Sequence, residues 1–98
     1  MLDDPGLQKL FGQVIGGKVS ARHLVEFRTE PSVDAAGQDA LRVTLVLTEL
    51  GALEMTGDEV SKLLIELHDS LVREGDERFP VLHFATVADL QDTREDDD

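Results

Sequence analysis

The sequence predicts an α+β protein with two layers, in which helices cover a three-stranded, mainly antiparallel sheet and the element order is α-β-β-α-β. Two patterns lead to this class. Leucine or valine stands at every second position over 41–47, which is typical of a strand with one buried face. A helical apolar pattern follows Thr56 and ends at Gly75. With 98 residues and no internal repeat, we expect one domain.

The first helix is expected to begin at Asp4 and Pro5. The Asp4 carboxylate can accept hydrogen bonds from the free N–H groups of a helix start. Proline fits the first helical position because its missing donor would be unpaired there. Apolar residues then recur at helical spacing, and Gly16 and Gly17 are expected to end the helix.

Two strands are expected next. Apolar and charged residues alternate over 22–30, which predicts a strand with one face in the core. The segment 31–39 is rich in Pro, Ser, Asp and Gly, and it predicts a long hairpin connection. The strand over 41–47 then follows. Its register is expected to be firmly fixed, because a slip of one residue would expose four large side chains.

The second half of the chain predicts a linker, a helix and a third strand. Residues 49–55 have no clean apolar period and are expected to form the linker. Thr56 and Glu59 have the spacing of a capping box, in which each side chain bonds the backbone N–H of the other residue. The third strand is expected over 79–86, with Pro80 at its start or on an edge because proline cannot donate a ladder hydrogen bond.

The domain is expected to span 1–91 and to close with a short helical turn through Leu90. Residues 92–98 (DTREDDD) are expected to be a disordered acidic tail. Over the whole chain 21 Asp and Glu stand against nine Lys and Arg, a net charge of −12. Such an excess opposes contact with nucleic acid or an anionic membrane, and no apolar run is long enough to span a bilayer.

The order of elements resembles that of the BolA and type II KH domains. Both of these also begin with a helix and place helical structure between their second and third strands. The resemblance is one of layout, since the GxxG loop with which type II KH domains clamp a nucleic-acid backbone is absent between Gly51 and Gly75. It therefore implies a fold and no ligand.

No catalytic residue and no cofactor are predicted. The chain has no cysteine, and its serines lie in no G-x-S-x-G motif. The weak candidates for a divalent-metal or small-ligand site are His23 and His83, which could meet across neighbouring strands beside Glu26. The alternative interpretation is that these histidines are half-buried, hydrogen-bonded residues of the fold.

The apolar residues outnumber those that one core stripe requires. On the expected second helix, Ile65 and Val72 lie outside the main apolar stripe and flank His68. The expected linker adds three further residues, so that the predicted interaction surface comprises Leu50, Leu53, Met55, Ile65, His68 and Val72. The alternative is that the first helix and the C-terminal turn cover these side chains and leave an acidic monomer.

The expected function is that of a non-enzymatic protein–protein interaction module, which pairs with itself or with a basic protein. Negative charge steers association towards positive surfaces and speeds encounter. The N-terminus is acidic and lacks the basic region of a secretory signal, so a cytoplasmic location is expected. The alternative function is a small-ligand or divalent-metal binding domain. Nucleic acid and membranes are not expected as partners.

Overall fold

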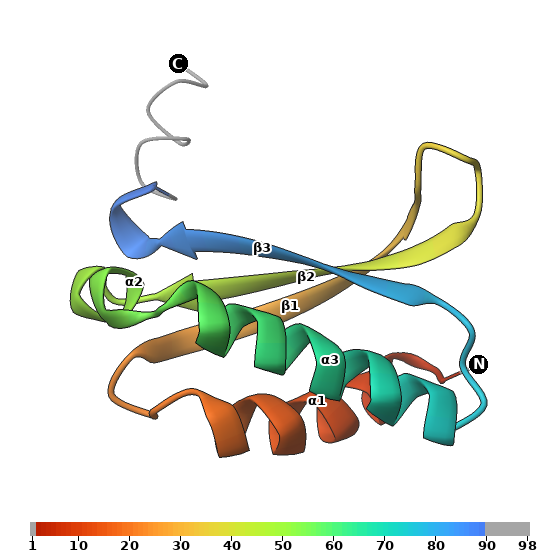
Figure 1. Ribbon diagram of the computed structural model, residues 1–98, viewed down its shortest axis with the longest axis horizontal. Coiled ribbons are helices and arrows are strands. Elements are labelled where there is room, and N and C mark those ends of the chain that lie inside the picture. The colour runs from red at the N-terminus through yellow and green to blue at the C-terminus, as the bar shows by residue number, and fades with distance from the viewer. Residues whose placement is uncertain (1, 90–98) are drawn as a thin grey trace.

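The computed structural model describes residues 2–89, which fold into two layers (Figure 1). Its elements are α1 (Asp4–Lys18), β1 (Leu24–Val33), β2 (Asp39–Leu47), α2 (Glu49–Glu54), α3 (Gly57–Arg73) and β3 (Phe79–Thr86). Helices α1 and α3 pack together on one face of the sheet, and α2 lies at the end of the sheet where β2 finishes. No described helix covers the other face along its length. The α+β class and the two-layer arrangement are confirmed.

The sheet has the strand order β1-β2-β3 and is mixed. Strands β1 and β2 form an antiparallel hairpin, as expected, whereas β2 and β3 are parallel. The difference follows from the connections. A short turn returns the chain in the opposite direction, but two helices separate β2 from β3, and such a crossover restores the direction of the strand. Strand β3 is an edge strand, which agrees with Pro80 as its second residue.

The core is built on the central strand. The side chains of Leu41, Val43, Leu45 and Leu47 are at most 1% exposed, so the predicted alternation places all four against the helices. They meet apolar residues of the two long helices, namely Leu7, Phe11 and Ile15 of α1 and Leu63, Leu67 and Leu71 of α3. Burial of one such side chain stabilises the fold by about 1.5–3 kcal/mol, so this cluster fixes the register of the sheet.

The capping residues of α1 and α3 lie at, or one residue from, their predicted positions. Thr56 and Glu59 form the capping box, with the Glu59 N–H donating to the Thr56 hydroxyl at 3.1 Å. At α1 the capping residue is Asp3 rather than Asp4, because the Asp3 carboxylate accepts the Gly6 N–H at 2.9 Å. The helix then continues beyond Gly16-Gly17 to Lys18.

The expected linker over 49–55 is wrong, since residues 49–54 form the helix α2 and Met55 is its C-cap. The Thr48 hydroxyl caps it by accepting the Gly51 N–H at 3.0 Å. The expected strand over 22–30 begins and ends slightly later, and the hairpin turn is shorter than expected. This turn is held by the Asp34 carboxylate, which accepts two backbone N–H groups, and by Gly37 with a φ of 82°.

A buried ion pair fixes the start of β3. The Asp76 carboxylate and the Arg78 guanidinium, 1% and 7% exposed, lie 2.6 Å apart. Both also bond Leu2, whose N–H donates to Asp76 and whose carbonyl accepts from Arg78. These hydrogen bonds, chiefly that from the Arg78 side chain, hold the pKa of Asp76 far below its ordinary value, although burial opposes them. We call Leu2, Asp76 and Arg78 the clamp.

Residues 87–89 are helical, in line with the expected C-terminal turn. The remainder of that turn and the acidic tail over 92–98 lie outside the described residues. Within the described chain no helix combines the length and the apolar character that crossing a membrane requires.

Candidate interaction surface

Strand β3 borders the sheet with an unusually apolar edge. Its eight residues, FPVLHFAT, include no Asp, Glu, Lys or Arg. The register places Val81 and His83 beside Arg42 and Thr44, on the face without helices, and Leu82 and Phe84 beside Val43 and Leu45 on the helix face. Phe79, Val81 and Phe84 nevertheless remain 40–50% exposed. No described strand pairs with the outer side of β3.

Helix α3 adds a stripe of uncharged side chains next to this edge. Ser61, Ile65, His68 and Val72 follow one another at spacings of three and four residues, so they share one face of the helix. The His68 ring lies 4.9 Å from the ring of Phe79, centroid to centroid, which shows that this stripe faces β3. Ile65 and Val72 are more than half exposed.

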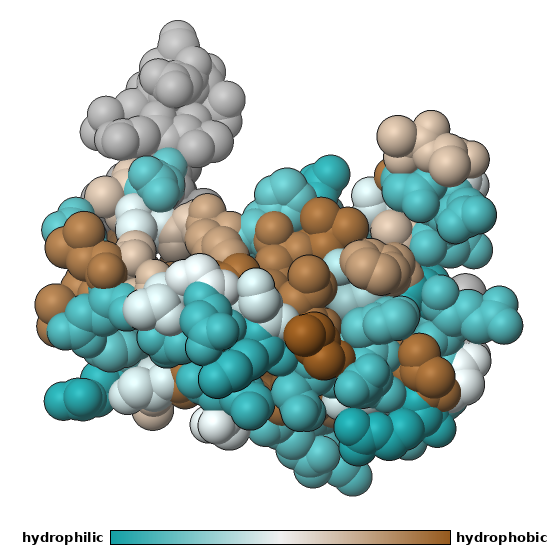
Figure 2. All heavy atoms as spheres, viewed as in Figure 1, coloured by the Kyte–Doolittle hydropathy of each residue, from teal (hydrophilic) through white to brown (hydrophobic). Residues whose placement is uncertain are grey.

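We group the exposed residues of the α3 stripe and of β3 under one name, the β3-edge surface. It consists of Ile65, His68 and Val72 on α3 and Phe79, Val81 and Phe84 on β3. Figure 2 shows hydrophobic side chains gathered along β3, with further ones over α3 below it and hydrophilic ones around them. The structure therefore brings together three of the six residues predicted for interaction.

The other three predicted residues lie on α2 and at its end. Leu50 and Leu53 are 58% and 83% exposed, and we call them the α2 pair. Met55 is half-buried against the core. It also lines a small apolar cavity of about 190 Å³ between α2, α3 and β3, to which Phe84 contributes.

The metal candidates are not brought together. The backbone carbonyl of His23 accepts the Thr48 N–H, whereas His83 lies beside Thr44 on the opposite edge strand. Four residues along β2 and the width of the sheet separate them, which is more than 10 Å at about 3.3 Å per residue. Glu26 instead bonds the Arg28 side chain on its own strand. The described residues contain no group of three or more His, Cys, Asp and Glu that could hold a metal ion.

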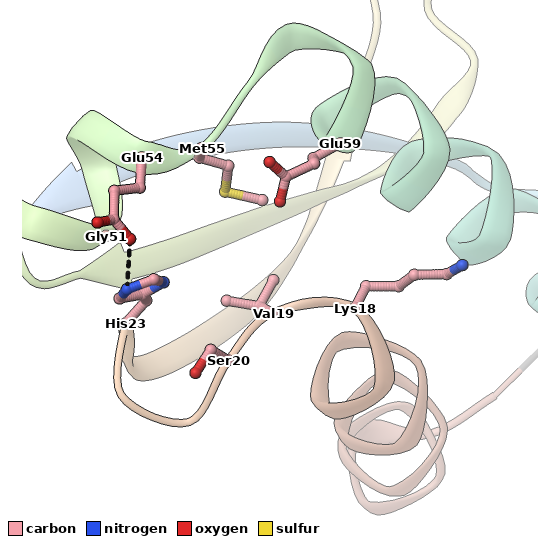
Figure 3. A pocket seen from close by; sticks show the side chains of 8 residues that line it. All are labelled: Lys18, Val19, Ser20, His23, Gly51, Glu54, Met55 and Glu59. Carbon is pink, nitrogen blue, oxygen red and sulfur yellow. Dashed lines mark ion pairs between the residues drawn. The ribbon is translucent and has the colours of Figure 1, made fainter.

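His23 lies in a different place, a pocket of about 250 Å³ between the end of α1 and α2 (Figure 3). Its Nε2 atom is 3.0 Å from a carboxylate oxygen of Glu54. Gly51 lets α2 approach closely here, because a Cβ atom at this position would come within 2.6 Å of the His23 Cβ. In Figure 3 the Lys18 side chain extends away from the His23–Glu54 pair. The pair therefore holds α2 against the start of β1.

Sequence reasoning missed the half of the β3-edge surface that β3 provides. The signal was the lack of any charged residue over 79–86 in a chain in which 31% of residues are charged. It also missed the clamp, because Asp76 and Arg78 have the sequence pattern of an ordinary solvated loop.

Comparisons with known proteins supply no relative. No protein-family model matches the chain, and neither a search of curated proteins nor one of solved structures gives a match. The resemblance to the BolA and type II KH domains thus remains one of element order.

Proposed function

We propose that this protein is a non-enzymatic interaction module that acts in the cytoplasm by binding another protein chain. The partner is a second copy or a basic protein. The observation that carries the proposal is the apolar area left exposed in the β3-edge surface and the α2 pair. Monomeric proteins rarely expose contiguous apolar patches larger than a few hundred Å², and larger patches mark interaction sites.

The charge of the chain supports a protein partner over the other macromolecules. A net charge of −12 attracts a basic protein over a distance set by the ionic strength and raises the rate of encounter. The same charge repels nucleic acid and anionic lipid headgroups. We therefore include neither nucleic acid nor membranes among the partners.

The test is to look for a stoichiometric complex. We expect the purified protein to associate with itself in light scattering, or a companion to co-purify with it at fixed stoichiometry from the cells that produce it. Leu53→Asp changes the α2 pair, and Ile65→Lys changes the β3-edge surface. Comparing the two variants shows which of these surfaces binds the partner. Val33→Lys serves as the control, because Val33 is exposed on β1, away from both groups. A protein that stays monomeric and has no companion would contradict the proposal.

The pocket at His23 supports a second candidate, a small-ligand or divalent-metal binding domain. His23 and Glu54 supply an imidazole and a carboxylate within 3.0 Å, two ligand types that zinc accepts. The pocket is smaller than the roughly 300–1,000 Å³ of most ligand sites. Calorimetric titration with Zn²⁺ decides this candidate. A heat of Zn²⁺ binding that disappears in His23→Ala and persists in His83→Ala would support this second function. No heat above background in the wild type would exclude it.

A further inference from the structure

The outer side of β3 has the features of a strand that pairs with another chain. Every second residue of an edge strand directs its N–H and C=O away from the sheet, where they can bond a further strand. Natural edges are usually blocked by charged side chains, bulges or proline. The pairing of β3 with β2 is regular over all eight residues, and β3 has no charge. Its one proline, Pro80, stands at the second position, which leaves the rest of the strand able to donate.

The lack of charge favours a second copy of this chain as the occupant. In a two-fold interface the same patch meets itself, so any charge near the axis meets its own equivalent. Over most of the surface of this protein such a self-contact would bring negative charges together, since the net charge is −12. The residues of β3 and the stripe from Ser61 to Val72 are uncharged, so two copies can meet here without facing like charges at the centre.

The geometry of a two-fold pairing is restricted. Two copies of β3 related by an axis perpendicular to the sheet run antiparallel, and residues opposite each other lie on the same face. A register centred on Leu82 places Val81 opposite His83 of the partner subunit. It also places α3 beside its equivalent on the same side of the sheet. Over residues 79–85 every pair of facing side chains in this register is uncharged, and Thr86 faces Arg78 of the partner subunit.

Of the two exposed apolar residues of α3, Ile65 and Val72, Ile65 lies nearer the axis. Phe79 contacts His68, and Phe84 lines the same small cavity as Val60. The middle of β3 therefore runs alongside the segment of α3 between these two points. Ile65 lies in this segment and is 59% exposed. In the dimer it would face its own equivalent.

The exposed apolar area approaches what a modest dimer needs. Phe79 and Phe84 are 50% and 41% exposed, which leaves roughly 80–100 Å² on each when a whole phenylalanine buries about 150–250 Å². Ile65, Val72 and Val81 add comparable amounts. Over two copies these side chains contribute on the order of 800 Å², before the strand backbone is counted. Specific interfaces begin at about 1,000 Å² in total.

We propose that this protein forms a two-fold homodimer in which the β3 strands pair antiparallel, giving a continuous six-stranded sheet with the two α3 helices in contact. This proposal rests on the proposed function as an interaction module and names the second copy as its partner. The β3-edge surface is then the dimer interface, and the α2 pair stays outside it.

The first experiment is sedimentation equilibrium of the wild type and three lysine variants. We expect Ile65→Lys to weaken the dimer by about 100-fold or more, because it removes two buried isoleucines and places two ammonium groups at the axis. Val72→Lys, farther from the axis, should weaken it less. Val33→Lys, on β1, makes the same change of charge and should leave the dimer intact. Circular dichroism confirms that each variant is folded. Equal dimerisation in all four proteins would overturn the proposal.

Salt separates this dimer from binding to a basic partner. Between about 20 mM and 500 mM NaCl the Debye length falls from roughly 20 Å to about 4 Å, so repulsion between two acidic subunits is screened. The homodimer should tighten, whereas a complex with a basic protein should weaken. Hydrogen exchange gives a direct readout, since the amides of β3 should become protected as the protein concentration rises.

The outcomes distinguish the two proposals. A wild type that is monomeric at all concentrations overturns the homodimer. If it nevertheless retains a stoichiometric companion that Ile65→Lys releases, the interaction module stands and the β3-edge surface has another occupant. Failure of both measurements removes the proposed function as well.

Discussion

The two edges of the sheet are built in opposite ways. On β1, Glu26, Arg28 and Glu30 project from the face without helices, Pro31 lacks a donor, and the register is interrupted by an irregularity between Leu24 and Glu26. All three devices block the addition of a strand. On β3 the pairing is regular, no residue is charged, and the only proline is next to the start. One sheet can therefore carry both a blocked edge and an edge suited to pairing.

The two edges also differ in what holds their starts in place. The chain enters β1 through His23, which is fixed by the close contact with Gly51, the bond to Thr48 and the pair with Glu54. It enters β3 through the clamp, which is buried and charged. Because the contacts of His23 and the clamp differ in chemistry, a substitution can weaken one without weakening the other. Each such substitution tests what holds the start of one edge strand in place.

The largest effect is expected at the clamp. Asp76→Asn leaves the Arg78 guanidinium buried without its counter-charge, which should lower the free energy of unfolding by about 3–5 kcal/mol. Urea denaturation measures this. The control is Asp58→Asn, which breaks the exposed pair between Asp58 and Lys62 and should cost less than about 1 kcal/mol. Equal losses in the two variants would show that burial of the clamp has no energetic consequence.

The pH dependence of the free energy of unfolding should reveal the contribution of the clamp. The pKa of Asp76 is lowered in the folded protein, so its contribution is fully present above the unfolded value of about 3.8 and is lost as the pH falls through the lower folded value. The difference in unfolding free energy between wild type and Asp76→Asn should therefore be constant above about pH 5 and shrink towards about pH 2. A difference that stays constant over this whole range would contradict the assignment.

A smaller loss is expected at the start of β1. Gly51→Ala places a Cβ atom 2.6 Å from the His23 Cβ and 2.9 Å from its carbonyl oxygen, so α2 or the α1–β1 connection must shift. We expect a loss of about 1–3 kcal/mol in urea denaturation. Gly16→Ala is the matched control. Its new methyl group has open space within a helix, so it should stabilise by up to about 1 kcal/mol. Stabilisation by both substitutions would refute the close contact.

The smallest effect on stability is expected from replacing the charged residues that block the edge of β1. Replacing Glu26, Arg28 and Glu30 with valine should change the unfolding free energy by less than about 1 kcal/mol, since all three are exposed. In the Ile65→Lys background, the triple variant should nevertheless associate with rising concentration, detected by light scattering. Neutralising Glu66, Asp69 and Arg73 on α3 instead provides the control. A triple variant that remains monomeric would show that the charges on β1 do not protect its edge.

Much of the fold could be predicted because its signals are local. The alternation over 41–47 identifies the buried face of β2 directly, and the Thr56–Glu59 spacing places the start of α3. Helix α2 has only six residues, too few to display a period, and its cap at Thr48 looks like the end of a strand. Strand direction is also not local, because it depends on how two helices carry the chain back across the sheet.

The candidate surface could be predicted only in part for a related reason. The apolar excess on α3 is visible in the sequence, since Ile65 and Val72 fall outside the stripe that faces the core. Which element lies beside that excess depends on the tertiary structure, so the sequence alone predicts only an ordinary strand for Phe79, Val81 and Phe84. The clamp joins residues 74 and 76 positions apart, a separation that no local pattern reveals. The interaction role of the six predicted residues stays a prediction.

The parallel crossover between β2 and β3 has a consequence for how the chain acquires its structure. The β1–β2 hairpin closes across a short turn and is complete once residue 47 has been made. Its other neighbour, β3, arrives only after two helices have been synthesised and ordered, a slow, long-range event. Until then β2, which is rich in leucine and valine, has one side without a paired strand. During synthesis, the vulnerable segment of this protein is the one that ends up most deeply enclosed.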